Sequence, residues 1–282
     1  MVAHIGSISV ARIAGDWHAP IGVVLGAVLA TALFLQAFVR LRRRRAERAP
    51  LSRLPLFGIG LALAVLPLVS PLDAAGDQYL LSAHMLQHVL IGDAAPLFLV
   101  LAVRGPLAFF LLPPRVLRPL AASVLVRAAL AFLLRPLVSF SLWAIAILAW
   151  HVPAAYDAAL AHPAVHVLEH LSFVIAGTLV WMQLIDPARH GRLTRGGKIG
   201  FAFGLLVVGH PVADVLLFTP HAVYTPYAAQ PHRLLGLGPV TDQRVAGAVM
   251  VAEQLLTLGS FVTIQLWPLL RSRPRRDMAV HA

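Results

Sequence analysis

Two stretches of this sequence place histidines at a spacing suited to binding a metal ion. His84 and His88 lie four residues apart, and His162, His166 and His170 repeat that interval. Side chains four residues apart project from the same face of a helix. Imidazole binds copper, zinc, iron and haem alike. The spacing therefore predicts a metal or haem site without choosing between them.

Other side chains with suitable chemistry accompany these histidines. Met85 offers a thioether, a soft ligand that favours copper(I). His151 ends an apolar stretch shortly before Pro153. His210 lies within another apolar stretch, directly before Pro211 and four residues before Asp214. Carboxylates within one helical turn can orient the imidazoles. The candidate ligands are His84, Met85, His88, His151, His162, His166, His170 and His210, with Asp77, Glu169 and Asp214 as orienting carboxylates.

Residues 166–170 also match the H-x-x-E-H pattern, in which two histidines bind zinc and the glutamate acts as general base. Here the pattern opens an apolar stretch, and no third ligand is identifiable by spacing. An intramembrane zinc protease is thus an alternative, but Glu169 fits better as a partner that orients an imidazole. We expect a protein that is not an enzyme. A haem-binding redox protein and a metal-free scaffold remain as further alternatives.

Composition indicates the elements that must position these residues. Of the 282 residues, 59% are hydrophobic and 12% are charged, whereas soluble domains average about 45–50% and about 25%. Segments of about 20 apolar residues cross a bilayer as helices. Between 104 and 135 the prolines interrupt the apolar run, which indicates an interfacial connection. We predict an all-α, polytopic bundle of about seven spans, at 20–39, 54–72, 78–102, 136–152, 164–186, 199–219 and 242–270.

The basic residues predict how the bundle is oriented. All but three of the 23 Lys and Arg residues lie on alternate connections and in the tail. The positive-inside rule places those connections in the cytoplasm, with the N-terminus outside and the C-terminus inside. The predicted organisation is an extracytoplasmic segment 1–19, one membrane domain 20–270 and a basic cytoplasmic tail 271–282. The net charge of +11 then requires no nucleic-acid partner.

The same orientation gathers eleven of the 13 histidines at or near the outer face; the exceptions are His190 and His281. Ionisable side chains inside a bilayer are costly and usually mark a site or a pathway. The chain has no cysteine, which excludes disulfides and thiolate metal ligands. Four spans that present histidine at one depth therefore predict a shared site, with copper favoured over haem.

Several motifs, taken in order, resemble one known family. They are SAHMLQH at 82–88 with APL at 95–97, WHVPAAYDAAL at 150–160, HPAVH at 162–166, EHLSF at 169–173 with Gly177 and Trp181, YTPY at 224–227, and DQRVAG at 242–247. Over about residues 54–270 the chain resembles the CtaG family of cytochrome c oxidase assembly factors.

The resemblance implies a multi-pass protein of the bacterial plasma membrane that is needed to form active haem–copper oxidase. Members are thought to help supply or insert the copper of the oxidase. The implied partners are cytochrome c oxidase subunits or other assembly factors, within the lipid bilayer. The positions that match the family motifs are His84, His88, His151, His162, His166 and His170.

Overall fold

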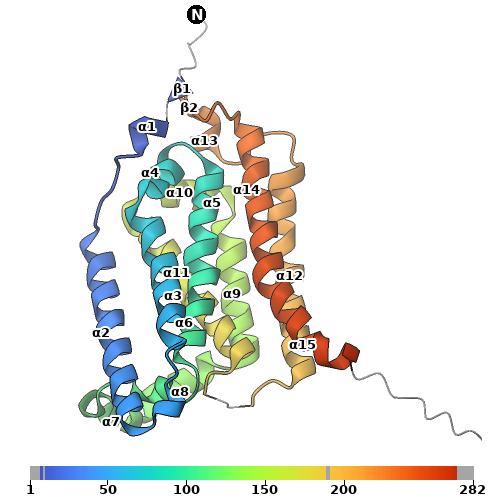
Figure 1. The fold of residues 1–282 in the computed structure, drawn as a ribbon. Helices are drawn as coiled ribbons and strands as arrows, with labels where there is room; N and C mark the ends of the chain where they lie inside the picture. The colour runs from blue at the N-terminus through green and yellow to red at the C-terminus, as the bar shows by residue number, and fades with distance from the viewer. Residues whose placement is uncertain (1–6, 9, 189–190, 272–282) are drawn as a thin grey trace, which may run out of the picture.

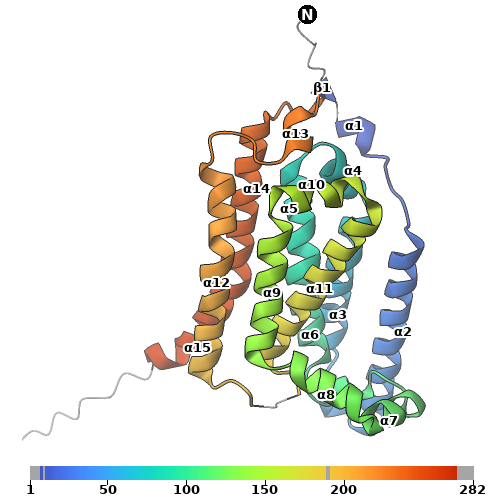
Figure 2. The ribbon, with the colours of Figure 1, turned by 180° about the vertical axis from the view of Figure 1, so that it is seen from behind.

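Long helices run side by side in the computed structural model, as Figure 1 shows, and Figure 2 gives the opposite face. The structure describes residues 7–8, 10–188 and 191–271. Most of the predicted tail, 272–282, and part of the predicted N-terminal segment lie outside these residues. The architecture confirms an all-α, polytopic helical bundle.

Six helices in the described part of the chain are long and apolar enough to cross a membrane, counting through short breaks. Their outward surfaces carry large apolar side chains; Ile21, Phe218 and Leu256 are 78%, 77% and 73% exposed. A bilayer solvates such surfaces, whereas water would not. The six are Ile21–Arg44, Ala46–Val69, Leu81–Val103, Pro163–Ile185, Arg195–Phe218 and Pro239–Pro268.

Regular α-helix makes up most of these spans, and two of them contain a π-helical segment. The α-helical parts are α2 (Ile21–Arg44), α3 (Arg53–Val69), α5 (Leu81–Val89), α6 (Ala95–Val103), α11 (Pro163–Ile185), α12 (Arg195–Phe218), α14 (Pro239–Gln254) and α15 (Ser260–Arg271). The π-helical segments are η2 (Leu90–Ala94) and η4 (Leu255–Gly259).

The remaining elements are shorter. The helices are α1 (Val10–Ile13), α4 (Pro71–Gln78), α7 (Pro114–Ala122), α8 (Val124–Leu133), α9 (Pro136–Trp150), α10 (Pro153–Ala161), α13 (Thr225–Ala229) and the 3-10 helices η1 (Ala46–Arg48) and η3 (Gly105–Phe110). The strands β1 (Ser7–Ile8) and β2 (Arg233–Leu234) pair in parallel.

The number of membrane spans depends on how two sharply bent helix pairs are counted. Helices α9 and α10 meet at 78°, and α7 and α8 meet at 85°. Counting each pair as one span raises the number from six to eight, a range that includes the predicted seven. Helix α9 corresponds to the predicted fourth span. The stretch predicted as an interfacial connection forms η3, α7 and α8, which lie across one end of the bundle (Figures 1 and 2).

The two ends of the bundle differ in character. Helix α2 ends in Arg42, Arg43 and Arg44, beside α7 and α8 at the lower end of Figure 1. The upper end carries the short elements α4, α10, α13 and the strand pair. Helices α5 and α11 run from that upper end into the middle of the bundle, and they carry the paired histidines.

Candidate metal centre

Four of the predicted histidines converge between α5 and α11. One ring nitrogen from each lies within 4.8 Å of the others. We call His84, His88, His166 and His170 the four-histidine group. Metal–nitrogen bonds are about 2.0–2.1 Å long, so two nitrogens on opposite sides of one ion lie about 4 Å apart. The group therefore has nearly the dimensions at which all four imidazoles contact a single ion.

Helical spacing creates each half of the group, and ring packing joins the halves. Within α5, the rings of His84 and His88 have centroids 4.3 Å apart; within α11, those of His166 and His170 are 4.1 Å apart. Across the helices, His84 stacks on His166 at 5.2 Å, and His88 meets His170 edge-on at 5.1 Å. His84 and His88 are buried, with 1% and 6% of their surfaces exposed.

The hydrogen bonding of the group leaves ligand atoms available. Among the described residues, neither ring nitrogen of His88 has a hydrogen-bond partner, nor does Nε2 of His166 or His170. A buried polar group without a hydrogen bond costs free energy unless something else compensates it. A metal ion that accepts the nitrogen lone pairs supplies that compensation. These residues consequently fit a metal ion held by neutral imidazoles.

Two carboxylates flank the four imidazoles. Asp77 Oδ1, at the end of α4, lies 3.6 Å from His84 Nδ1 and 3.8 Å from His166 Nε2. Glu169 Oε1 lies 3.9 Å from His88 Nε2, and its side chain is 1% exposed. Burial and the nearby carboxylate of Asp73 raise the pKa of Asp77 to about 7. A cation bound to the imidazoles would favour the ionised form of these carboxyl groups and would be stabilised by it.

Asp242 positions the histidine helix, although the sequence analysis gave it no role in the site. Its carboxylate, on α14, accepts hydrogen bonds from the backbone N–H groups of Leu81 (2.7 Å) and Ser82 (3.2 Å) and from the Ser82 hydroxyl. These N–H groups have no partner inside α5, since they open the helix. A cap supplied by another helix could be found only from contacts between distant residues, not from local spacing.

Three tyrosines pack beside the group, at the end of the bundle that carries α4, α10 and α13, and were also not predicted. Tyr156 stacks on Tyr224 at 4.0 Å, and its ring lies 5.3 Å from that of His84. The Tyr227 hydroxyl donates to the Gly76 carbonyl at 2.6 Å. Gly76 in turn packs directly on His84, since a Cβ there would lie 3.0 Å from the His84 backbone. The tyrosines thus fix α4, α10 and α13 around the histidines.

The remaining predicted residues lie elsewhere. His162 begins α11 at an exposed position, outside the four-histidine group. His210 is 47% exposed on α12 and pairs with Asp214 at 3.6 Å, so both face away from the group. His151 and Met85 line a cavity that His88 also lines. Sequence spacing could not separate these positions because it does not fix which way each helix is turned.

Comparison with known proteins identifies one family. The family model Caa3_CtaG, described as cytochrome c oxidase caa3 assembly factor, matches residues 32–272. The matched residues include α5, α11, α14 and every member of the four-histidine group. No curated protein and no solved structure matches the chain.

Proposed function

This chain belongs to the family of cytochrome c oxidase caa3 assembly factors, and we propose that it serves oxidase maturation by binding copper at the four-histidine group. Its membership implies interaction with the oxidase or with the machinery that assembles it. In this proposal the chain supplies or inserts copper and catalyses no reaction. The four buried imidazoles with nitrogens in reach of one another are the observation that carries the proposal.

The donor set supports a metal ion in preference to haem. Haem iron takes its axial ligands from the two faces of a porphyrin, which keeps further imidazoles away from the iron. Here four imidazoles converge on one point. Their chemistry suits copper or zinc. Haem–copper oxidase requires copper, and for that reason we assign copper as the metal.

The position of Glu169 supports an orienting role over that of a protease base. A general base must reach a water molecule and a substrate. The Glu169 carboxylate is instead enclosed, with 1% of the residue exposed, and its nearest titratable partner is His88. A carboxylate beside a ligating imidazole raises the basicity of the ligand and holds its ring.

The orientation in the membrane forms part of the proposal. The arginine-rich end of the bundle, with α7 and α8, would face the cytoplasm of the bacterial cell under the positive-inside rule. The four-histidine group would then lie in the outer half of the plasma membrane, close to α4, α10 and α13. Subunits of the oxidase that receive copper from outside the membrane would meet the protein at this end.

Complementation of a strain that lacks this protein tests the function in cells. We expect the His166→Ala/His170→Ala variant to leave oxidase copper content and activity at the level of the empty strain, although the variant reaches the membrane in normal amounts. The control is His210→Ala, which removes an exposed imidazole outside the group and should restore both. Full restoration by the double variant would refute a copper role for the group.

A further inference from the structure

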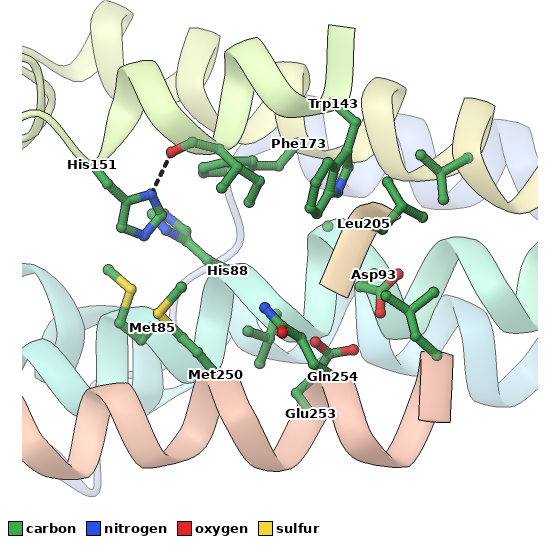
Figure 3. A pocket seen from close by; sticks show the side chains of 15 residues that line it. Met85, His88, Asp93, Trp143, His151, Phe173, Leu205, Met250, Glu253 and Gln254 are labelled. Atoms are coloured by element: carbon green, nitrogen blue, oxygen red, sulfur yellow. Dashed lines mark hydrogen bonds between the residues drawn. The ribbon is translucent and has the colours of Figure 1, made fainter. Parts of the chain in front are cut away.

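A second set of metal-binding atoms surrounds a cavity that His88 also lines. The cavity has a volume of about 60 Å³ and lies among α5, α9, α11 and α14. Figure 3 shows His88, His151, Met85 and Met250 at one end, and Asp93, Glu253 and Gln254 toward the other. The sulfur atoms of the two methionines lie beside the imidazoles in this view.

The hydrogen bonding of His151 prepares its other nitrogen to bind a metal. Nδ1 lies 2.7 Å from the carbonyl oxygen of Ile147, and a carbonyl can only accept, so Nδ1 carries the proton and donates. The lone pair of the neutral ring is then on Nε2. That nitrogen is buried and has no hydrogen-bond partner among the described residues. A backbone carbonyl that fixes the tautomer in this way is usual for histidines that bind metals.

Two thioethers accompany this nitrogen. Met85 and Met250 are 1% and 5% exposed and pack in the same core cluster, from α5 and α14. Met85 follows His84 by one residue, about 100° around the helix, which turns it from the four-histidine group toward the cavity. Thioether sulfur is a soft ligand that selects copper(I) over harder ions.

Two carboxyl groups line the same cavity, and each accepts a hydrogen bond. Asp93 accepts a hydrogen bond from the Trp181 indole at 2.5 Å, and Glu253 accepts one from Thr257 at 2.9 Å. Both carboxyl groups line the cavity, toward the end away from His151.

The backbone is irregular where the pair lies. Asp93 is inside the π-helical segment η2, and Glu253 lies two residues before the π-helical segment η4. Such segments occur frequently at functional sites. Gln254 lines the cavity there, with its Oε1 lacking a hydrogen-bond partner among the described residues. Side-chain packing alone would not require two π-helical segments and an unpaired amide oxygen beside one cavity.

We propose that His151, Met85 and Met250 form a second metal site, selective for copper(I), which exchanges the ion with the four-histidine group through the intervening His88. This assignment rests on the proposed function, which identifies copper as the ion that the chain carries. No change of oxidation state is involved, because the ion enters and leaves as copper(I). Carboxyl groups in the same cavity can offset its charge within the membrane.

X-ray absorption at the copper edge tests this site on the full-length protein, purified in detergent and loaded with copper(I) under a reductant. We expect about two copper ions per chain, with sulfur as well as nitrogen in the coordination shell. Met85→Leu/Met250→Leu should lose the sulfur signal and bind about one ion, since leucine preserves side-chain volume. Met182→Leu, on α11 outside the cavity, should match the wild type.

The possible results distinguish failure of the second site from failure of the proposed function. One copper ion with nitrogen ligands alone in the wild type would overturn the second site and leave the four-histidine site standing. Protein that takes up no copper would overturn both. The wild-type spectrum decides the question even if the double variant fails to fold.

Discussion

Replacing His84 and His88 together by alanine is expected to lower the affinity for copper at the four-histidine group by at least about a thousandfold. Sites with four protein ligands bind with free energies on the order of 10 kcal/mol or more. Losing two of the four ligands removes several kcal/mol of this binding free energy. Each 1.4 kcal/mol lost lowers the affinity about tenfold. Both residues lie in helix α5, and alanine favours helical structure. The variant should therefore still fold into the membrane.

Competition with a copper chelator of known affinity measures this effect in detergent. The matched control is His162→Ala/His210→Ala, which also removes two imidazoles but takes them from outside the group. That control should bind copper as the wild type does. Equal losses in the two variants would show that the number of histidines matters and their placement does not.

Replacing Gly177 by alanine is expected to destabilise the bundle at the crossing of α11 and η2. A Cβ at Gly177 would lie 1.7 Å from the carbonyl oxygen of Gly92, far inside contact distance. The obstacle is backbone, so the helices themselves must separate. Overpacking usually costs about 1–3 kcal/mol and sometimes more. Because His88 and His170 lie about two helical turns or less from this crossing, we also expect weaker copper binding.

Thermal unfolding in detergent measures the loss, which we expect to be on the order of 5–10 °C. Gly58→Ala is the control, since no atom lies within 4 Å of a Cβ there and alanine favours a helix. An unfolding temperature that Gly177→Ala leaves unchanged would mean that the close approach of α11 to η2 is unnecessary. Small residues at such crossings are typical of helices in membranes, where close packing holds the bundle together.

Apolar runs sufficed to predict most of the bundle. The second span was predicted at 54–72, and the structure has α3 at Arg53–Val69; the fifth was predicted at 164–186, and α11 is Pro163–Ile185. Length and hydropathy decide such segments because the backbone inside a bilayer must satisfy its own hydrogen bonds. The short helices α4 and α10 were not predicted separately, since they lie outside the longest apolar runs.

Half of the candidate site followed from spacing, and half did not. The interval of four residues paired His84 with His88 and His166 with His170, as the structure has them. Only the packing of α5 on α11 brings the pairs together. The same interval grouped His162 with His166 and His170. In the structure α11 begins at Pro163, so His162 lies just before the helix in an exposed position. Met250 lay in no motif, so contacts in three dimensions were needed to find it.

The copper content of the protein as purified from its own membrane tests the central claim most directly. Elemental analysis and an absorption spectrum on the same sample report metal and haem together. We predict at least about one copper per chain, because four converging imidazoles form a complete ligand set, and no Soret band. Protein free of metal that still restores oxidase activity in cells would contradict the account and identify the chain as a scaffold.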